Sequence, residues 1–240
     1  TPQSIQSYAT LATIIFQTNQ NEQHGGQAIP AFDFFMAKGV AKSFRKHLAS
    51  FINFYVAMEN GTQADEKAIR TLIKEHLSSI KSTEAEREAL RIALIALQII
   101  IDKEHLTRIA EKAYQQTRKD THQAMEGFIH NLNTMHSRGG NQVVFSSINY
   151  GTDTSAEGRL VIEELLKATI EGLGTRGEVP VFPIQIFKVK DGVSYSEKDF
   201  EKAMKMEKIE DAMKSTYEAP NFDLLLQACQ TTAKALFPNF

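Results

Sequence analysis

The residues with the clearest potential to bind a ligand lie in one short segment near the middle of the chain. Ser137 and Arg138 come directly before the pair Gly139 and Gly140, so a cation and unhindered backbone amides are neighbours. Successive free amides form concavities that bind anions, and arginine pairs with phosphate through two parallel hydrogen bonds. The segment is therefore a candidate contact for phosphate or ribose. A plain hinge with a solvent-facing arginine is the alternative.

Three further polar side chains follow in a stretch that is otherwise suited to burial. Ser146, Ser147 and Asn149 alternate with bulky apolar residues up to Tyr150. Burying an unpaired hydroxyl or amide costs free energy, so each of these groups needs a partner. Either a bound ligand or a neighbouring strand would provide one.

Other kinds of site chemistry have little support. A thiol nucleophile or radical carrier would have to be Cys229, the one cysteine, and its neighbours at 224–228 are typical of the buried side of a helix. The seven histidines lack a metal-ligand spacing, since His122 and His130 are eight residues apart on one expected helix. We therefore expect neither a catalytic residue nor a metal site in this chain.

Composition limits the partners and the compartment. The net charge of −2 over 240 residues, with both signs interspersed, argues against a basic face for DNA. The longest apolar run, residues 92–101, is about half of a bilayer span and predicts a buried helix instead of a membrane segment. A single cysteine fits a reducing compartment, so we expect the cytoplasm. The first residue is not methionine, which is consistent with an internal piece of a longer protein.

The elements that must position these residues divide into two halves. In the first half, apolar residues recur with helical spacing. They predict helices over 4–20, 32–58, 65–80, from Thr83 onward, and over 107–135. Gly39 is a possible interruption of the second helix, and Thr83 with Glu86 forms a capping-box pattern. Residues 1–136 are thus expected to be mainly helical.

In the second half the periodicity changes to that of strands. Residues 143–150 alternate as a strand does, and residues 181–189 predict a second, buried strand. Between them, Thr154 and Glu157 form another capping-box pattern, and the glycines at 172–177 predict a helix end. Strand, helix and strand in this order imply parallel pairing. Two more helices are expected over 197–215 and 221–236, so residues 137–240 should form an α/β segment.

Several segments resemble, in the right order, the anaerobic ribonucleoside-triphosphate reductases, which are glycyl-radical enzymes. They are His-Gly-Gly-Gln at 24–27, Lys-His-Leu at 46–48, residues 123–138, residues 145–154, Pro-Val-Phe-Pro at 180–183, and residues 234–239. The resemblance covers nearly the whole chain. Residues 191–220 are longer and more charged than the family leads us to expect.

The resemblance implies a fold and a reaction. The fold is a ten-stranded α/β barrel of two half-barrels around a finger loop, with long helices at a homodimer interface. The reaction reduces ribonucleoside triphosphates through glycyl and thiyl radicals. It needs an iron–sulfur activase that uses S-adenosylmethionine, often formate as reductant, and a zinc site. Because Cys229 matches no radical cysteine of the family, we expect a fragment of the large catalytic subunit that is inactive alone and holds no cofactor.

The resemblance also implies an effector site for ATP and deoxynucleotides. Lys46 is expected to contact a phosphate or base carbonyl, Asn131 to lie at the site from the end of a helix, and Phe145 to stack on a base. In some relatives an acid is expected where Asn131 stands, which leaves base selectivity open. The loop at 137–141 would then couple the effector to the substrate.

Two alternatives remain open from the sequence. One is a helical dimerisation module without catalysis, which the large apolar helices favour. The other is an unrelated α/β nucleotide-binding protein that uses the Gly139 and Gly140 loop.

Overall fold

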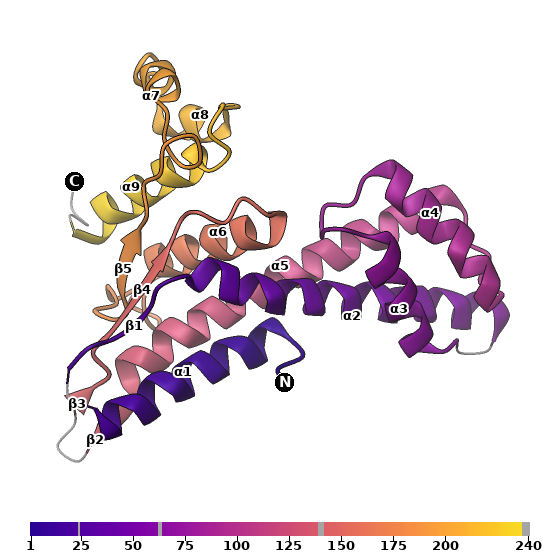
Figure 1. Ribbon diagram of the computed structural model, residues 1–240, viewed down its shortest axis with the longest axis horizontal. Helices are drawn as coiled ribbons and strands as arrows, with labels where there is room; N and C mark the ends of the chain where they lie inside the picture. The colour runs from indigo at the N-terminus through magenta and orange to yellow at the C-terminus, as the bar shows by residue number, and fades with distance from the viewer. Residues whose placement is uncertain (24, 62–63, 139–141, 237–240) are drawn as a thin grey trace.

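The computed structural model describes residues 1–23, 25–61, 64–138 and 142–236 (Figure 1). Its helices are α1 (Ile5–Glu22), α2 (Phe32–Asn60), α3 (Glu66–His76), α4 (Glu84–Leu94), the 3-10 turn η1 (Ile95–Leu97), α5 (Lys103–Thr134), α6 (Ala156–Glu171), α7 (Glu197–Met204), α8 (Ile209–Lys214) and α9 (Phe222–Leu236). Its strands are β1 (Gln27–Ile29), β2 (His136–Arg138), β3 (Gln142–Val143), β4 (Ser146–Tyr150) and β5 (Ile184–Phe187).

The two longest helices, α2 and α5, lie side by side and run in opposite directions (Figure 1). The ring of Phe32 packs on Phe128 with centroids 5.0 Å apart, and the His47 ring lies 2.8 Å from the Asp120 carboxylate. The apolar stripes that predicted both helices supply the contact between them, so these two predictions are confirmed.

Gly39 does not interrupt α2. A side chain there would meet the Tyr8 ring at 3.0 Å and the Ile5 backbone at 3.1 Å. The glycine therefore lets α1 approach α2 closely, and the possible interruption expected from the sequence is wrong.

A small parallel sheet lies against the helices in the order β1, β4, β5. Ser147 of β4 is paired with Ala28 of β1 and with Ile184 of β5. The parallel pairing expected around α6 is confirmed. The alternation of apolar and polar residues along the sequence did not predict β1, because a strand of three residues is too short to show this period.

One face of this sheet is open. Ile148 and Tyr150 of β4 are buried in the helical core, whereas Ile184 and Ile186 of β5 are 44% and 45% exposed. The strand predicted over residues 181–189 is confirmed in its central part as β5, but its predicted burial is wrong. An apolar run is buried on both faces only where helices cover both faces.

Residues 92–101 do not form a buried helix either. α4 ends at Leu94, one 3-10 turn follows, and Gln98 takes a left-handed conformation with φ of 60°. Asp102 then caps α5 by accepting the amide of His105. Ile100 is 82% exposed as a result. None of the helices in the described ranges combines the length and apolar content that a membrane crossing requires.

The helix ends test the capping predictions. Thr83 and Glu86 form the expected capping box. The second box is wrong, because Ser155 instead of Thr154 caps α6, and Glu157 accepts the amide of Ile80 at 2.9 Å. Gly172 ends α6 with φ of 75°, as the glycines predicted. Residues 197–215 form two short helices instead of one.

Candidate functional site

The described part of the polar segment expected to bind a ligand belongs to β2, which directly follows α5 and contacts α1 (Figure 1). β2 and β3 form a short antiparallel hairpin in which His136 is paired with Val143. Ser137 and Arg138 lie in β2. Gly139 and Gly140 fall outside the residues that the structure describes.

Directly after the hairpin, the backbone at Phe145 is held from two sides. The Gln20 side chain of α1 accepts the Phe145 amide at 3.0 Å and donates to the carbonyl of Val143 at 3.2 Å. The Phe145 carbonyl accepts the amide of Gln27 at 2.9 Å. Gln20, which the sequence did not single out, thereby fixes the start of β4.

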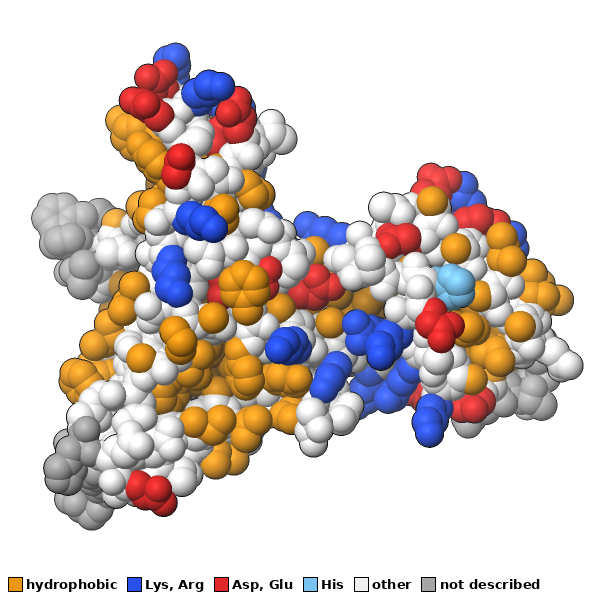
Figure 2. All heavy atoms as spheres, viewed as in Figure 1, with side chains coloured by type: hydrophobic (Ala, Val, Ile, Leu, Met, Phe, Trp, Pro, Cys, Tyr) orange, Lys and Arg blue, Asp and Glu red, His pale blue; other side chains and the backbone are white. Residues whose placement is uncertain are grey.

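The Phe145 ring itself is 53% exposed. It meets Phe182 edge-on with ring centroids 5.1 Å apart, and a side chain at Gly26 would come within 2.9 Å of it. An exposed ring with fixed neighbours is suited to stacking on a planar group, and base stacking on an aromatic side chain is worth about 1–3 kcal/mol. Figure 2 shows other hydrophobic side chains gathered over α1 and the nearby strands.

Asn133 of α5 holds the partner ring in place. Its side-chain oxygen accepts the amides of Val181 and Phe182, each at 3.0 Å, and its nitrogen donates to the Ile129 carbonyl at 2.7 Å. The sequence pointed to Asn131 instead. Asn131 is half-buried two residues earlier, and its carbonyl accepts the amide of Met135 at 3.0 Å.

Lys46 lies exposed on α2, away from the other expected effector residues. Its neighbour His47 contacts Asp120 of α5, which is eleven residues before Asn131. At the helical rise per residue this corresponds to about 16 Å along α5. A single copy of the chain therefore does not bring Lys46 and Asn131 together.

The polar residues of β4 are divided between the two faces of the sheet. Ser147 and Asn149 lie on the open face, in register with Ile184 and Ile186 of β5. Ser146 is buried on the other face, where its hydroxyl donates to the carbonyl of Val144 at 3.2 Å. Ser147 and Asn149 thus share a face with each other and not with Ser146.

A buried carboxylate fixes the turn after β4. Asp33, at the start of α2, accepts the amides of Gly151, Thr152 and Asp153 at 2.9, 3.1 and 3.0 Å. Asn221 donates to the carbonyls of Gly151 and Asp153 at 3.0 and 2.9 Å. In parallel sheets ligands bind beyond the carboxyl ends of the strands, so this cluster sets the geometry of the position where a ligand is expected.

Tyr150 ends β4 beside this carboxylate. Its hydroxyl lies 2.8 Å from the Gln185 side-chain oxygen, to which it donates. Burial, with a smaller contribution from Asp33, raises the pKa of Tyr150 well above its usual value. The phenol is therefore a fixed hydrogen-bond donor and not an acid that ionises near neutral pH.

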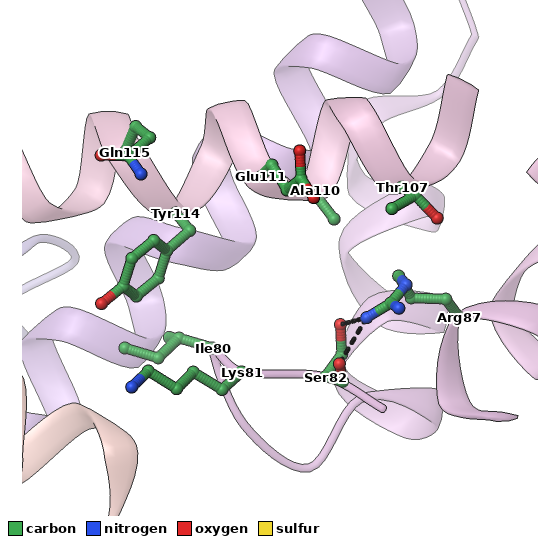
Figure 3. Close-up of a pocket in the computed structure, with 9 residues that line it drawn as sticks. All are labelled: Ile80, Lys81, Ser82, Arg87, Thr107, Ala110, Glu111, Tyr114 and Gln115. Atoms are coloured by element: carbon green, nitrogen blue, oxygen red, sulfur yellow. Dashed lines mark hydrogen bonds between the residues drawn. The ribbon is translucent and has the colours of Figure 1, made fainter. Parts of the chain in front are cut away.

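A separate hollow lies between residues 80–87 and α5 (Figure 3). Lys81 and Tyr114 extend towards one end of it, and Arg87 bonds to Ser82 at the other. Glu111 also lines the hollow. Cations and a carboxylate are mixed here, so the lining favours no single class of ligand.

Long paired helices packed on one face of a small parallel sheet define a mixed α/β protein. Within that class the chain belongs to the anaerobic ribonucleoside-triphosphate reductase family, whose model matches residues 1–240. The family expected from the segment resemblance is thus confirmed.

Individual relatives carry the same name. The chain is 31% identical over 127 residues to the anaerobic ribonucleoside-triphosphate reductase of Escherichia coli K12, which is 53% of this chain and 15% of that protein. The reductase of phage T4 is 33% identical over 127 residues, 53% of this chain and 18% of its own length. The reductase of Haemophilus influenzae is 31% identical over 121 residues, which is 50% of this chain and 14% of that protein. The matched part is a small fraction of each relative.

The zinc site implied by the resemblance does not fit this chain. Four thiolates would be needed, and the sequence has one cysteine. Cys229 is exposed on α9, whereas its neighbour Ala228 is buried. The expected burial of Cys229 is therefore wrong by one helical position.

Proposed function

We propose that this chain is a fragment of the large catalytic subunit of an anaerobic ribonucleoside-triphosphate reductase. The whole enzyme would reduce ribonucleoside triphosphates to deoxynucleotides for DNA synthesis by glycyl and thiyl radical chemistry. An iron–sulfur activase using S-adenosylmethionine would install the radical, and formate would supply electrons. The isolated chain would be inactive because Cys229 matches no radical cysteine. Its cysteine content favours the cytoplasm.

The open face of the sheet is the observation that carries this proposal. Parallel sheets are normally covered on both faces, yet Ile184 and Ile186 stand half exposed beside Ser147 and Asn149. A ten-stranded barrel would close over this face and turn the two polar side chains towards a substrate. Residues 1–136 and 137–240 would then be parts of one larger catalytic domain.

The effector site of this fragment would require two copies of the chain. Phe145 would stack on the base of ATP or a deoxynucleotide, with Asn131 near it. Since Lys46 lies about 16 Å along the helix pair from Asn131 in one copy, a phosphate contact would come from Lys46 of the second copy in a homodimer. The loop at 137–141 would couple this nucleotide to the substrate beside Ser147 and Asn149.

Deoxynucleotide binding to the chain tests this function. We would titrate each deoxynucleoside triphosphate by calorimetry and record the oligomeric state by light scattering. Phe145→Leu should weaken binding by about tenfold, which is the loss of one stacking contact, and Lys46→Ala should weaken it while leaving the dimer intact. Phe54→Leu is the matched control, because Phe54 is also an exposed phenyl ring but lies on α2, outside the candidate site.

The outcomes of this titration distinguish the reductase fragment from the helical dimerisation module. A folded dimer with no affinity for any deoxynucleotide would favour the helical dimerisation module. Equal affinity in the Phe145 and Phe54 variants would remove the stacking role. The family match already excludes an unrelated nucleotide-binding protein.

A further inference from the structure

His122 of α5 lies among carboxylates from two helices, away from the candidate effector site. Its Nε2 atom is 2.9 Å from Glu171, the last residue of α6, and 4.0 Å from Glu126, one turn further along α5. Its Nδ1 atom is 3.0 Å from Glu164 of α6. Both ring nitrogens therefore face an acceptor.

A neutral imidazole can donate from only one of its two nitrogens. If Nδ1 donates to Glu164, the lone pair of Nε2 faces the carboxylates of Glu171 and Glu126. That arrangement is favourable only if a cation lies between them or if the ring carries a second proton. Glu164 is the most buried of the three acceptors, at 4% exposed against 50% for Glu126 and 56% for Glu171, and a buried carboxylate has the greatest need of a donor.

Glu164 is held rigidly and is 4% exposed. Its other oxygen accepts from Arg118 at 2.8 Å and from Lys167 at 3.1 Å. A buried carboxylate on Nδ1 is the arrangement that orients metal-binding histidines and presents Nε2 to the ion. Glu164 is thus placed to fix the ring and not to bind an ion itself.

The distances on the Nε2 side match a coordination shell. Metal bonds of about 2.1 Å at angles from about 90° to 180° separate two ligand atoms by about 3.0 to 4.2 Å. The separation of Nε2 from Glu126, 4.0 Å, falls inside this range, and that from Glu171, 2.9 Å, lies at its lower end. The ligand atoms of His122, Glu126 and Glu171 lie within 4.8 Å of one another, so an ion that binds all three would draw the exposed carboxylates slightly closer together.

Charge and space agree with an ion at this position. Four carboxylates meet here, from Glu126, Glu164, Glu171 and the Arg118 partner Glu163, against the two cations Arg118 and Lys167. The neutral-imidazole state therefore carries two excess negative charges. Glu126 also lines an adjoining open hollow of about 280 Å³, which gives solvent access to this side of the cluster.

We propose that His122, Glu126 and Glu171 bind a divalent transition-metal ion, with Zn²⁺ the best match to one imidazole and two carboxylates. The ion joins the last turn of α6 to the middle of α5. The histidine spacing alone gave no such site, because Glu171 is 49 residues away from His122 in the sequence.

Zinc binding to the chelator-treated 240-residue chain tests the site. We would titrate ZnCl₂ by calorimetry above neutral pH and follow Co²⁺ by its visible absorption. One ion per chain is expected, and Glu171→Gln, an exposed and nearly isosteric change, should weaken it about tenfold or more. His105→Gln is the control, since exposed His105 also contacts a carboxylate, Asp102 at 2.6 Å, but lies outside this cluster.

Binding that survives Glu171→Gln and Glu126→Gln unchanged would place the ion elsewhere and overturn the proposal. So would the absence of bound zinc at millimolar concentration in a chain whose circular dichroism shows it folded. Deoxynucleotide binding, measured separately on the same variants, should not change. A failure of either idea is therefore distinguishable from a failure of the other.

Discussion

At the scale of single residues, three polar side chains each hold a backbone segment that is far away in the sequence. Asp33 resembles an ordinary first-turn acid, yet it is fully buried and accepts three amides from the turn after β4. Gln20 and Asn133 are equally unremarkable in the sequence, and each fixes a backbone segment more than 45 residues away. Such roles depend on tertiary contacts, which no periodicity encodes.

Cys229 gives a direct test at this scale. Because its thiol is exposed on α9, we expect the folded chain to react with an aromatic disulfide reagent at nearly the rate of the unfolded chain. The matched variant carries Cys229→Ser with Ala228→Cys and moves the thiol to a buried position. It should react about a hundredfold more slowly, since reaction there requires local opening. Equal rates in absorbance assays would contradict the assigned faces of α9.

At the scale of elements, the sequence predicted the helices and caps that depend on nearby residues. It did not predict burial, which depends on whether another layer of the fold covers an element. α1, α2 and α5 follow from their apolar stripes, and the α4 capping box from Thr83 and Glu86. Residues 92–101 are as apolar as a buried helix, but their turn conformation at Gln98 leaves Ile100 in solvent. Phe145 was singled out through family resemblance, and the local pattern gave no reason to choose its ring.

Glu86, at the start of α4, should make the free energy of unfolding of the chain fall at acid pH. A hydrogen bond from the Ser78 hydroxyl, with others from the backbone of Thr83 and Ser78, lowers the pKa of Glu86 to about 2. A carboxyl group whose pKa is lowered in the folded state stabilises the fold at pH values above its unfolded pKa of about 4.3. This stabilisation is lost as the pH falls towards 2. Because solvent screens this exposed helix end, we expect only about 1 kcal/mol.

Urea unfolding between neutral pH and pH 2 measures this effect. Glu86→Gln should be less stable than the parent at pH 7 by about 1 kcal/mol, with the difference closing towards pH 2. Ser78→Ala, which removes the largest cause of the shift, should show part of the same pH dependence. A difference that stays constant with pH would assign the role of Glu86 to packing instead of charge.

At the scale of the whole molecule, the two faces of the sheet differ in what covers them. The helical core buries Ile148 on one face, while the other face presents Ile184 and Ile186 with Ser147 and Asn149. Strands β4 and β5 run between α7–α9 and the β2–β3 hairpin (Figure 1). An uncovered apolar strand face favours association with other protein surfaces. In the proposed enzyme the second half-barrel would fill that role.

The open face should therefore tolerate polar substitutions that the covered face does not. The double variant Ile184→Thr and Ile186→Thr should lower the free energy of unfolding by about 1 kcal/mol or less, because both side chains already meet water. It should also bind less of an apolar fluorescent dye and associate less in light scattering. Ile148→Thr, on the covered face of the neighbouring strand, should cost about 2–4 kcal/mol through lost burial and an unpaired hydroxyl. If instead the double variant proved as destabilising as Ile148→Thr, this chain would cover both faces of the sheet by itself in solution, and no second half-barrel would be needed to cover the face that holds Ile184 and Ile186.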